Sequence, residues 1–446
     1  MICNVPLTPE QKQRSQFNYC CYCGINGISY MCLGETVMVL LAVRLALPDW
    51  AVAAISAMLF FGFALLPLGK WMTARVGAAR SQADFWVARN IVAVGVAMSV
   101  PWSLLGWRWL AVGSVLGGAF LFYGFRAAGV VMSVPLIGEI TDERSRGTQL
   151  GRSNGLFNTA ATISLVAVSA LMYWRDSIWT LFGIILFGAV CGVTASRFLN
   201  RIDETEGLRE SARHPLSEDI PQILRSPAIR RMILGRICTN LCLLMTTGIS
   251  ILAMKRGYGI SDFEALGFSL ILYAAKSLGS PLCSLLADRI GARQALQAFF
   301  LCSAAAAPLW IFAPQNYCLL HALSLFILLG LGDCGAEIGK GLYFLQCVPQ
   351  KLQTSASVIV SLFDGALTGL LAIALNALIL KGGEALTAES PMALAKYQMY
   401  YRLALPFLAF AFWGVSRQRF LPHAPGRTGR PMPPPTDDSP TTRHSP

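Results

Sequence analysis

The hydrophobic residues of this chain are grouped into long uninterrupted runs and do not alternate with polar positions. A helix needs about 20 apolar residues to cross the ~30 Å hydrocarbon core of a bilayer. Twelve runs fit that requirement, at residues 24–47, 50–69, 85–104, 110–138, 151–174, 177–198, 231–253, 265–287, 294–313, 317–348, 356–380 and 397–417. The pattern predicts twelve transmembrane helices. Short turns such as the one at Pro48 join neighbouring runs, so consecutive helices must pack antiparallel.

Two polar stretches interrupt this pattern and define the expected domains. The stretch at 199–230 separates the sixth run from the seventh and contains a surface helix around 216–231. The C-terminal stretch is rich in Pro, Thr, Ser and Arg, a composition typical of disorder. We expect an N-terminal six-helix bundle (1–198), a cytoplasmic linker (199–230), a C-terminal six-helix bundle (231–417) and a disordered Pro-rich tail (418–446).

The two sets of six runs resemble each other in sequence. The segment 156–162 aligns with 362–368 at an offset of 206 residues, and Asn158 then corresponds to Asp364. Earlier in each half, the segment 74–78 aligns with 288–292 at an offset of 214, and the difference lies in the loops. Self-similarity at a fixed spacing is the sequence signature of a duplicated unit. The chain is therefore predicted to be two parallel copies of a six-helix unit.

Composition and charge agree with a multi-pass membrane protein. The chain has 446 residues, of which 54% are hydrophobic and only 13% charged, which excludes an ordinary soluble domain. Lys and Arg are concentrated in the N-terminus, the linker and every second loop, which places both termini in the cytoplasm. The net charge of +12 is thus a topology signal with anionic lipid as its neighbour, and no nucleic-acid partner is expected. We expect the plasma membrane, or the inner membrane of a Gram-negative cell.

The sequence carries no recognisable enzyme chemistry. The thirteen cysteines lie mostly in apolar runs without metal-ligand spacing, so neither disulfides nor a metal site are expected. The segment 335–341 resembles a phosphate loop but has one residue too few and no following Ser or Thr. We predict a protein that is not an enzyme and that uses no cofactor.

The tenth run contains three charges that need an explanation. Asp333, Glu337 and Lys340 would project from one face of a helix, and each charge at the bilayer centre costs roughly 2.5–3.5 kcal/mol. Five glycines at 330–341 favour close backbone approach and a kink or break. This stretch is either a substrate or proton site or a structural salt-bridge cluster between packed helices. Asp333 and Glu337, one turn apart, would titrate as a coupled pair.

Charged and polar residues in other runs complete the candidate path. Glu35 lies in the middle of the first run, and its carboxyl either pairs with Arg126 or stays protonated. Lys276 and Asp364 are also deep, and Asn158 is a candidate for a hydrogen bond to solute. The predicted substrate and proton path therefore comprises Glu35, Arg126, Asn158, Lys276, Asp333, Glu337, Lys340 and Asp364.

The numbers of acidic and basic residues deep in the apolar runs are not equal. Four acids (Glu35, Asp333, Glu337 and Asp364) face three bases (Arg126, Lys276 and Lys340), and one spare carboxyl is typical of a proton carrier. Other arginines lie nearer the ends of their runs, where snorkelling explains them: Arg44, Arg89, Arg236 and Arg402. Counting Arg236 among the deep bases would remove the excess of acid.

The loop after the second run of each half carries a repeated motif. In the second half it contains Asp288, Arg289, Gly291 and Arg293; in the first half it contains Arg75 and Gly77, with Ala74 in the place of the acid. We expect Asp288 to meet a helix N-terminus or a basic neighbour, Gly291 to allow a tight turn and Arg293 to cap an opposing helix. This motif resembles the cytoplasmic gating signature of the major facilitator superfamily. Arg126 and Gly129 are similar to that family's intramembrane Arg motif.

The resemblance covers residues 20–420 and implies alternating access, in which two six-helix bundles rock about a site near the midplane. The first hypothesis is a secondary active transporter, a proton-coupled symporter of a small polar or anionic solute. The second is a proton-driven drug or metabolite efflux antiporter, and the third is a non-transporting membrane sensor. The expected partners are a small-molecule solute, a proton and membrane lipid, and the expected state is a monomer.

Overall fold

The computed structural model describes residues 2–3, 5–48, 51, 55, 58–143, 145–175, 177–260, 262–387 and 393–418. Apart from Gln418, the expected Pro-rich tail lies outside this range, as does part of the second apolar run. Nearly all the described residues are helical. In the first half the elements are β1 (Ile2–Cys3), α1 (Pro9–Leu33), α2 (Glu35–Arg44), η1 (Gly62–Leu65), α4 (Leu66–Val76), α5 (Ala78–Ala97), α6 (Ser99–Leu104), α7 (Arg108–Val130), α8 (Ser133–Ile140), α9 (Arg146–Trp174) and α10 (Ile178–Leu199).

The linker and the second half of the chain are also mostly helical. The linker holds β2 (Glu204–Thr205), α11 (Glu206–Arg213) and α12 (Leu216–Arg225). The second half holds α13 (Pro227–Gly257), α14 (Asp262–Ile290), α15 (Ala292–Ala304), α16 (Ala306–Ile311), α17 (Leu319–Cys347), η2 (Gln350–Leu352), α18 (Gln353–Ser361), the π-helix η3 (Leu362–Leu367), α19 (Thr368–Leu386) and α20 (Ala393–Ser416). Among the described residues, ten helices are long and apolar enough to cross a membrane. α20 occupies the twelfth run, and the second run is only partly described.

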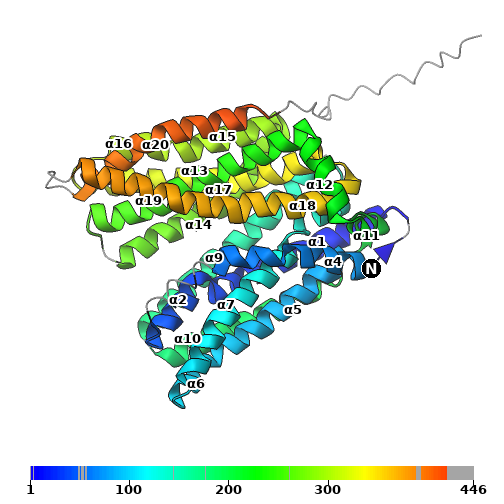
Figure 1. Ribbon diagram of the computed structural model, residues 1–446, viewed down its shortest axis with the longest axis horizontal. Coiled ribbons are helices and arrows are strands. Elements are labelled where there is room, and N and C mark those ends of the chain that lie inside the picture. The colour runs from blue at the N-terminus through cyan, green and yellow to red at the C-terminus, as the bar shows by residue number, and fades with distance from the viewer. Residues whose placement is uncertain are drawn as a thin grey trace, which may run out of the picture.

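The helices form two bundles that lie side by side, one from each half (Figure 1). In the figure the bundles approach each other near α11 and α12 and diverge toward α6 and α16. We call the end that carries α11 and α12 the linker side. One buried hydrophobic core runs through the C-terminal bundle and the linker-side half of the N-terminal bundle. A separate core fills the other half of the N-terminal bundle. The two bundles therefore share a core only on the linker side.

Direct contacts between the bundles also lie on the linker side or toward the midplane. Helices α9 and α14 touch where the Ser280 hydroxyl donates to the Gly151 carbonyl at 2.7 Å, and the hydroxyls of Thr159 and Ser277 are hydrogen-bonded. On the opposite edge of the interface, Gly365 leaves room for the Phe63 ring, since a Cβ at this position would collide with it. Small and hydroxyl-bearing residues thus allow the backbones of the two bundles to approach closely, as in other membrane helix pairs.

The glycine-rich stretch of the tenth run does not break its helix. α17 is continuous from Leu319 to Cys347, so the expected break is wrong, while the expected close approach is right. A Cβ at Gly332 would meet Ser303, and one at Gly335 would meet the Phe299 ring, both from α15. The glycines therefore provide space for a neighbouring helix. The interruption occurs in the first run, where Gly34 has extended backbone (φ −65°, ψ 168°) between α1 and α2.

The two copies of the loop motif form the same turn. Gly77 and Gly291 have φ of +93° and +91°, a left-handed conformation that only glycine adopts without strain. Arg293 donates to the Ser416 carbonyl at 2.8 Å, at the end of α20. The first copy of the turn lies at the linker, because Gly77 packs against Glu204 of β2 and Ile2 of β1, and β1 near the N-terminus pairs with β2. The N-terminus, the linker and the end of α20 therefore lie on one side.

A buried acid of the linker holds the first of these turns. Glu204 is 3% exposed, and its carboxylate accepts hydrogen bonds from the amides of Ala78 (2.8 Å) and Ala79 (3.3 Å) at the N-terminus of α5. A side chain at Gly77 would collide with that carboxylate. Desolvation by burial raises the pKa of Glu204 to about 7, although the two amides act in the opposite direction.

This raised pKa predicts a pH dependence of stability. Because the folded protein binds a proton at Glu204 between pH 4.5 and about 7 and the unfolded chain does not, the contribution is largest at low pH. It is lost as the pH rises through this window, by up to about 3 kcal/mol. We expect the difference in thermal midpoint between wild type and Glu204→Gln to change across pH 5–8. Glu218→Gln, at an exposed linker position, is the control, and a pH-independent difference would contradict the assignment.

Candidate functional site

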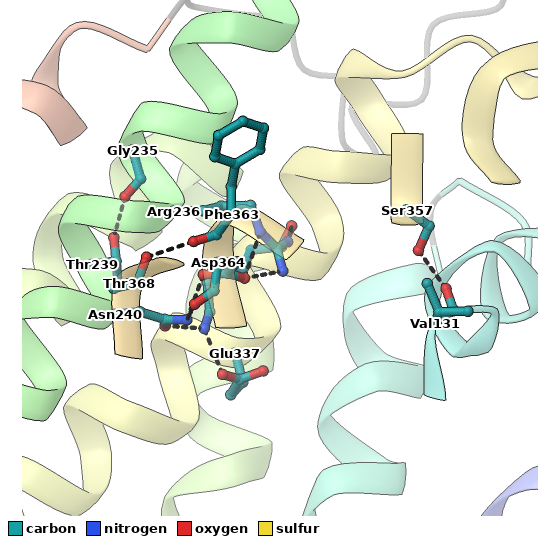
Figure 2. Close-up of polar contacts among 11 residues, drawn as sticks. Val131, Gly235, Arg236, Thr239, Asn240, Glu337, Ser357, Phe363, Asp364 and Thr368 are labelled. Carbon is teal, nitrogen blue, oxygen red and sulfur yellow. Dashed lines mark hydrogen bonds and ion pairs between the residues drawn. The ribbon is translucent and has the colours of Figure 1, made fainter. Parts of the chain in front are cut away.

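A cluster of five polar side chains lies inside the C-terminal bundle, centred on Asp364 of the π-helix η3. We call Arg236 and Asn240 of α13, Glu337 and Lys340 of α17, and Asp364 the Asp364 cluster (Figure 2). Arg236 donates to one carboxylate oxygen of Asp364 from Nε (2.9 Å) and Nη2 (2.6 Å). The Asn240 amide donates to the other oxygen. Both oxygens are therefore satisfied, and the buried carboxylate is held in its ionised form by a charge-assisted pair.

The backbone around Asp364 departs from α-helical geometry in a way that serves this contact. The π-helix frees carbonyl groups, and the Asp364 carbonyl accepts a hydrogen bond from the Asn240 amide at 3.1 Å. The Thr368 hydroxyl donates to the Phe363 carbonyl at 2.7 Å. Single-turn π segments are frequent at functional sites. Here the π segment aims an acid at α13, while the next residue, Gly365, packs against Phe63 of the other bundle.

Lys340 joins the cluster to an accessible carboxylate. Its side chain is 2% exposed, and its ammonium group donates to Asn240 Oδ1 at 2.6 Å and to Glu337 Oε1 at 2.5 Å. The Glu337 side chain is 56% exposed, whereas its neighbours on α17 are mostly buried. Gly341, one turn further along, packs against Leu150 of α9 in the other bundle. Glu337 thus lies one turn from the interbundle contact, facing the space between the bundles.

A second ion pair joins α14 to α17. Lys276 and Asp333 form a salt bridge, with side chains 17% and 23% exposed. The Lys276 ammonium also lies 5.0 Å from the centre of the Tyr273 ring. Asp333 and Glu337 therefore have separate cationic partners. The predicted face of α17 does carry three charges, but they belong to two ion pairs: Asp333 pairs with Lys276 of α14, and Glu337 pairs with Lys340 within α17.

The N-terminal bundle contributes Arg126, which contacts an aromatic ring. Its guanidinium lies 4.9 Å from the centre of the Tyr30 ring, and Tyr30 packs on Phe157 of α9. Arg126 and Tyr30 lie within electrostatic range of Tyr273 and its neighbours in the C-terminal bundle. Among the described side chains, no carboxylate forms a salt bridge with Arg126. The predicted pairing of Arg126 with Glu35 lies outside the description, which does not cover the Glu35 side chain.

Two arginines expected to snorkel are buried instead. Arg236 binds Asp364, with a side chain 14% exposed. Arg89 is 1% exposed; its guanidinium donates to Ser29 and Asn26, at 3.2 and 3.4 Å, and lies over the rings of Trp86 and Phe122. The snorkelling prediction is wrong for Arg89, and Arg236, a borderline case by sequence, belongs with the deep bases, because each faces a neighbouring helix of its own bundle. Arg402 is exposed, and Arg44 lies at the end of α2.

These placements reverse the expected charge balance. With Arg89 and Arg236 counted among the deep cations, five cations face four carboxylates, including Glu35. In the C-terminal bundle the deep charges pair with one another in three ion pairs. The excess is therefore positive and lies in the N-terminal bundle, at Arg89 and Arg126. The spare carboxyl expected from the sequence does not exist in this set.

Asn158 is not joined to the other predicted residues by any described contact. It is 8% exposed in α9, and its carbonyl accepts from Thr162 at 2.7 Å. Its repeat counterpart Asp364 lies in the cluster. Asn240, which the sequence reasoning missed, corresponds to Asn26 at the 214-residue offset of the loop motif. A polar residue one turn after Arg236 within an apolar run was the signal that could have identified it.

Asp288 joins the two bundles on the linker side. Its carboxylate accepts a hydrogen bond from the Thr148 hydroxyl at 3.1 Å and leaves no room for a side chain at Gly147. Asp288 therefore lies at the N-terminus of α9, where a helix dipole favours a negative charge. In the first-half copy, Arg75 lies over the Trp71 ring. The remaining predicted motif residue, Arg289, ends α14 together with Ile290.

A hollow of about 430 Å³ lies between α1, α9 and α10, away from these charges. Its walls are mostly apolar, with Ile28, Val168 and Ile184 among them, and Arg175 lies at one end. It contains none of the predicted site residues.

Among the described residues, no group of His, Cys, Asp and Glu has the arrangement of a metal site.

Comparisons with known proteins agree on the architecture. The family model described as Major Facilitator Superfamily matches residues 17–373, and no curated protein sequence matches the chain. The proton:xylose symporter XylE bound to 6-bromo-6-deoxy-D-glucose is similar, with a TM-score of 0.66 and 12% identity over 90% of this chain and 95% of that one. These likenesses confirm the predicted all-α membrane fold of twelve helices.

Two further solved structures share the fold. A bacterial homologue of the iron transporter ferroportin in the outward-facing state has a TM-score of 0.67 and 13% identity, over 91% of this chain and 98% of that one. The human organic anion transporter MFSD10 has a TM-score of 0.61 and 11% identity, over 92% of this chain and 100% of that one. At such identities the likeness concerns the fold alone.

The Asp364 cluster generates a prediction about stability. Arg236→Met would leave the Asp364 carboxylate buried without its cation, and we expect a loss of about 3 kcal/mol. Arg236→Met combined with Asp364→Leu removes both charges and should recover most of that loss. Thermal unfolding of the purified protein measures both effects. Lys396→Met is the matched control, because Lys396 pairs with Glu384 at 3.0 Å in an exposed position, where about 0–1 kcal/mol is expected. A double variant as unstable as the single one would contradict this account.

Proposed function

Because the chain belongs to the major facilitator superfamily, we propose that it is a secondary active transporter, a proton-coupled symporter of a small polar or anionic solute. Alternating access of the two bundles carries the solute across the membrane. We also propose the predicted topology, with both termini and the linker in the cytoplasm of a plasma or inner membrane, and a monomeric unit. The predicted domain division, 1–198, 199–230, 231–417 and 418–446, is part of the same proposal.

The observation that carries proton coupling is the exposure of Glu337 beside a buried Lys340. In the Asp364 cluster two cations balance two carboxylates while Glu337 is ionised. A proton on Glu337 neutralises the accessible carboxylate and leaves the cluster with one net positive charge. That charge raises the affinity of the nearby space for an anion. By reciprocity, a bound anion raises the affinity of Glu337 for a proton. Proton and anion therefore bind together, as symport requires.

The interbundle contacts support alternating access. The contacts between α9 and α14 and between Asp288 and Thr148 lie on the linker side or toward the midplane. The described state is thus closed on the linker side. Glu337 lies one turn from the contact of Gly341 with Leu150. A group at this position experiences the closing of the bundles directly, which allows its proton affinity to change with the conformation.

The charge balance favours an anionic solute over a cationic one. Five deep cations against four carboxylates repel a cation and attract an anion. Arg126 is the accessible member of the positive excess, and its guanidinium can bind a carboxylate or phosphate group bidentately. The aromatic rings of Tyr30 and Tyr273 nearby suit the apolar part of such a solute. The drug or metabolite efflux antiporter has no such specific observation in its favour, and no described feature favours a sensor.

The first transport prediction concerns the proton. Uptake into proteoliposomes, measured over a panel of small acids and sugars, should increase when the interior is more alkaline than the exterior. Glu337→Gln should keep solute exchange at equal pH and lose the response to the gradient, because its amide cannot release a proton. Glu384→Gln is the matched control, since Glu384 is also an exposed partner of a lysine but lies near the end of α19. Wild-type uptake that does not depend on the pH gradient would refute proton coupling.

The second transport prediction concerns the anion. Arg126→Gln should raise the KM for an acidic solute by about 10–100-fold, in line with the 1.5–3 kcal/mol of a hydrogen bond to a charged group. Arg126→Lys should retain part of the affinity, because it keeps the charge and loses the bidentate geometry. Arg402→Gln, at an exposed position on α20, should leave the KM unchanged. Equal effects of Arg126→Gln and Arg126→Lys would argue against charge recognition.

A further inference from the structure

The two halves of the chain close the linker side by different means. In the second-half motif, Asp288 of the C-terminal bundle bonds directly to Thr148 at the start of α9 in the N-terminal bundle. The internal repeat places Ala74 at the position of Asp288 and Thr354, at the start of α18, at the position of Thr148. Ala74 has no side chain that could reach Thr354. The symmetry-related contact is therefore absent as a direct bond between the bundles.

The linker helix α11 occupies this position. Arg209 donates to the carbonyl of Ala74 at 3.3 Å and to that of Arg75 at 2.9 Å. Two residues later, the Ser211 hydroxyl is hydrogen-bonded to Thr354 (2.9 Å) and donates to the Lys351 carbonyl (2.8 Å). One helix thus binds both groups that an acid at position 74 would have connected.

The next linker helix, α12, supplies the missing acid. Asp219 is 4% exposed; it accepts a hydrogen bond from Ser355 of α18 and lies 3.9 Å from the ammonium of Lys70 in α4. Lys70, also 4% exposed, donates to the His214 carbonyl between the two linker helices. Lys70 corresponds by the 214-residue offset to Ser284, just before Asp288. The buried carboxylate therefore connects the same two helices, α4 and α18.

The linker is fixed to both bundles, and only Ser226 separates α12 from α13 of the C-terminal bundle. Glu204 binds the N-terminus of α5, and Arg209 binds the end of α4. Its hydrogen bonds to α18 are those of Ser211 with Thr354 and of Asp219 with Ser355, and Ser211 also donates to the Lys351 carbonyl in η2. Opening of the linker side would separate α4 from α18, so the linker must release its bonds to one of these two helices. The neighbouring contact of Glu139 with Gln350, at 2.8 Å, spans the same gap.

We propose that the linker is the gate of the first half: Arg209 and the Lys70–Asp219 pair tie it to α4, while Ser211 and Asp219 bind α18 in place of the acid that Ala74 lacks. The gate closes the linker side together with the Asp288–Thr148 bond. Because the bundles rock as rigid bodies, releasing one bond set weakens the other. Ser211, Asp219 and Lys70 are thus gating residues that bind neither solute nor proton.

Hydrogen exchange of the full-length protein in lipid nanodiscs tests this gate without any solute. The variant Ser211→Ala/Asp219→Ala removes both of the linker's side-chain hydrogen bonds to α18. We expect amides at 353–361, which make up α18, and amides at 146–151, at the start of α9, to exchange about tenfold faster than in wild type, since both become accessible when the linker side opens. Thr148→Val, which removes the direct bond to Asp288, should accelerate the same two segments.

The controls separate a gate from local fraying. Glu218→Gln removes an exposed carboxylate from the same helix and should change neither segment. Faster exchange at 353–361 alone would mean that the linker only stabilises α18 locally, and the gate would be refuted. Unchanged exchange at both segments would refute it as well. Ser211→Ala alone, with a smaller expected increase at both segments, provides the test if the double variant elutes differently from wild type in gel filtration.

Discussion

The constraint behind this structure is the cost of a charge inside a bilayer. Each deep cation or carboxylate must find a partner, an aromatic face or accessible space. The C-terminal bundle solves the problem with three ion pairs, built on α13, α14, α17 and the π-helix η3. The N-terminal bundle buries Arg89 among hydroxyl, amide and aromatic groups, without a carboxylate among the described side chains. This difference leaves the positive excess on which anion recognition rests.

The helices that hold the charges also form the interface between the bundles. Glu337 lies one turn before Gly341, which packs against α9, and Asp364 immediately precedes Gly365, which packs against Phe63. A change of charge at either acid therefore acts on a helix whose next turn or next residue touches the other bundle. Coupling between the site and the conformation needs no long pathway, because the two are separated by at most one helical turn.

The internal repeat gave both halves the same helices and turns but not the same chemistry. Gly77 and Gly291 adopt nearly the same backbone angle, yet only the second motif keeps its acid. The first half uses a segment from outside the repeat, the linker, whose Asp219 and Ser211 contact α18. A duplicated fold can lose a residue in one copy when a neighbouring segment takes over its contacts.

The sequence by itself determined the membrane fold, the repeat and the depth of the charged residues, because these depend on run length and composition. It also identified Lys340, Asp333 and Asp364 as buried charges that need partners. It could not decide which helix each side chain faces. For that reason Arg89 was expected to snorkel from near the end of its span and Arg236 was a borderline case, and the balance of deep charge came out with the wrong sign. Only the packing of the helices assigns the partners, since an ion pair between α13 and η3 joins residues 128 positions apart in the chain.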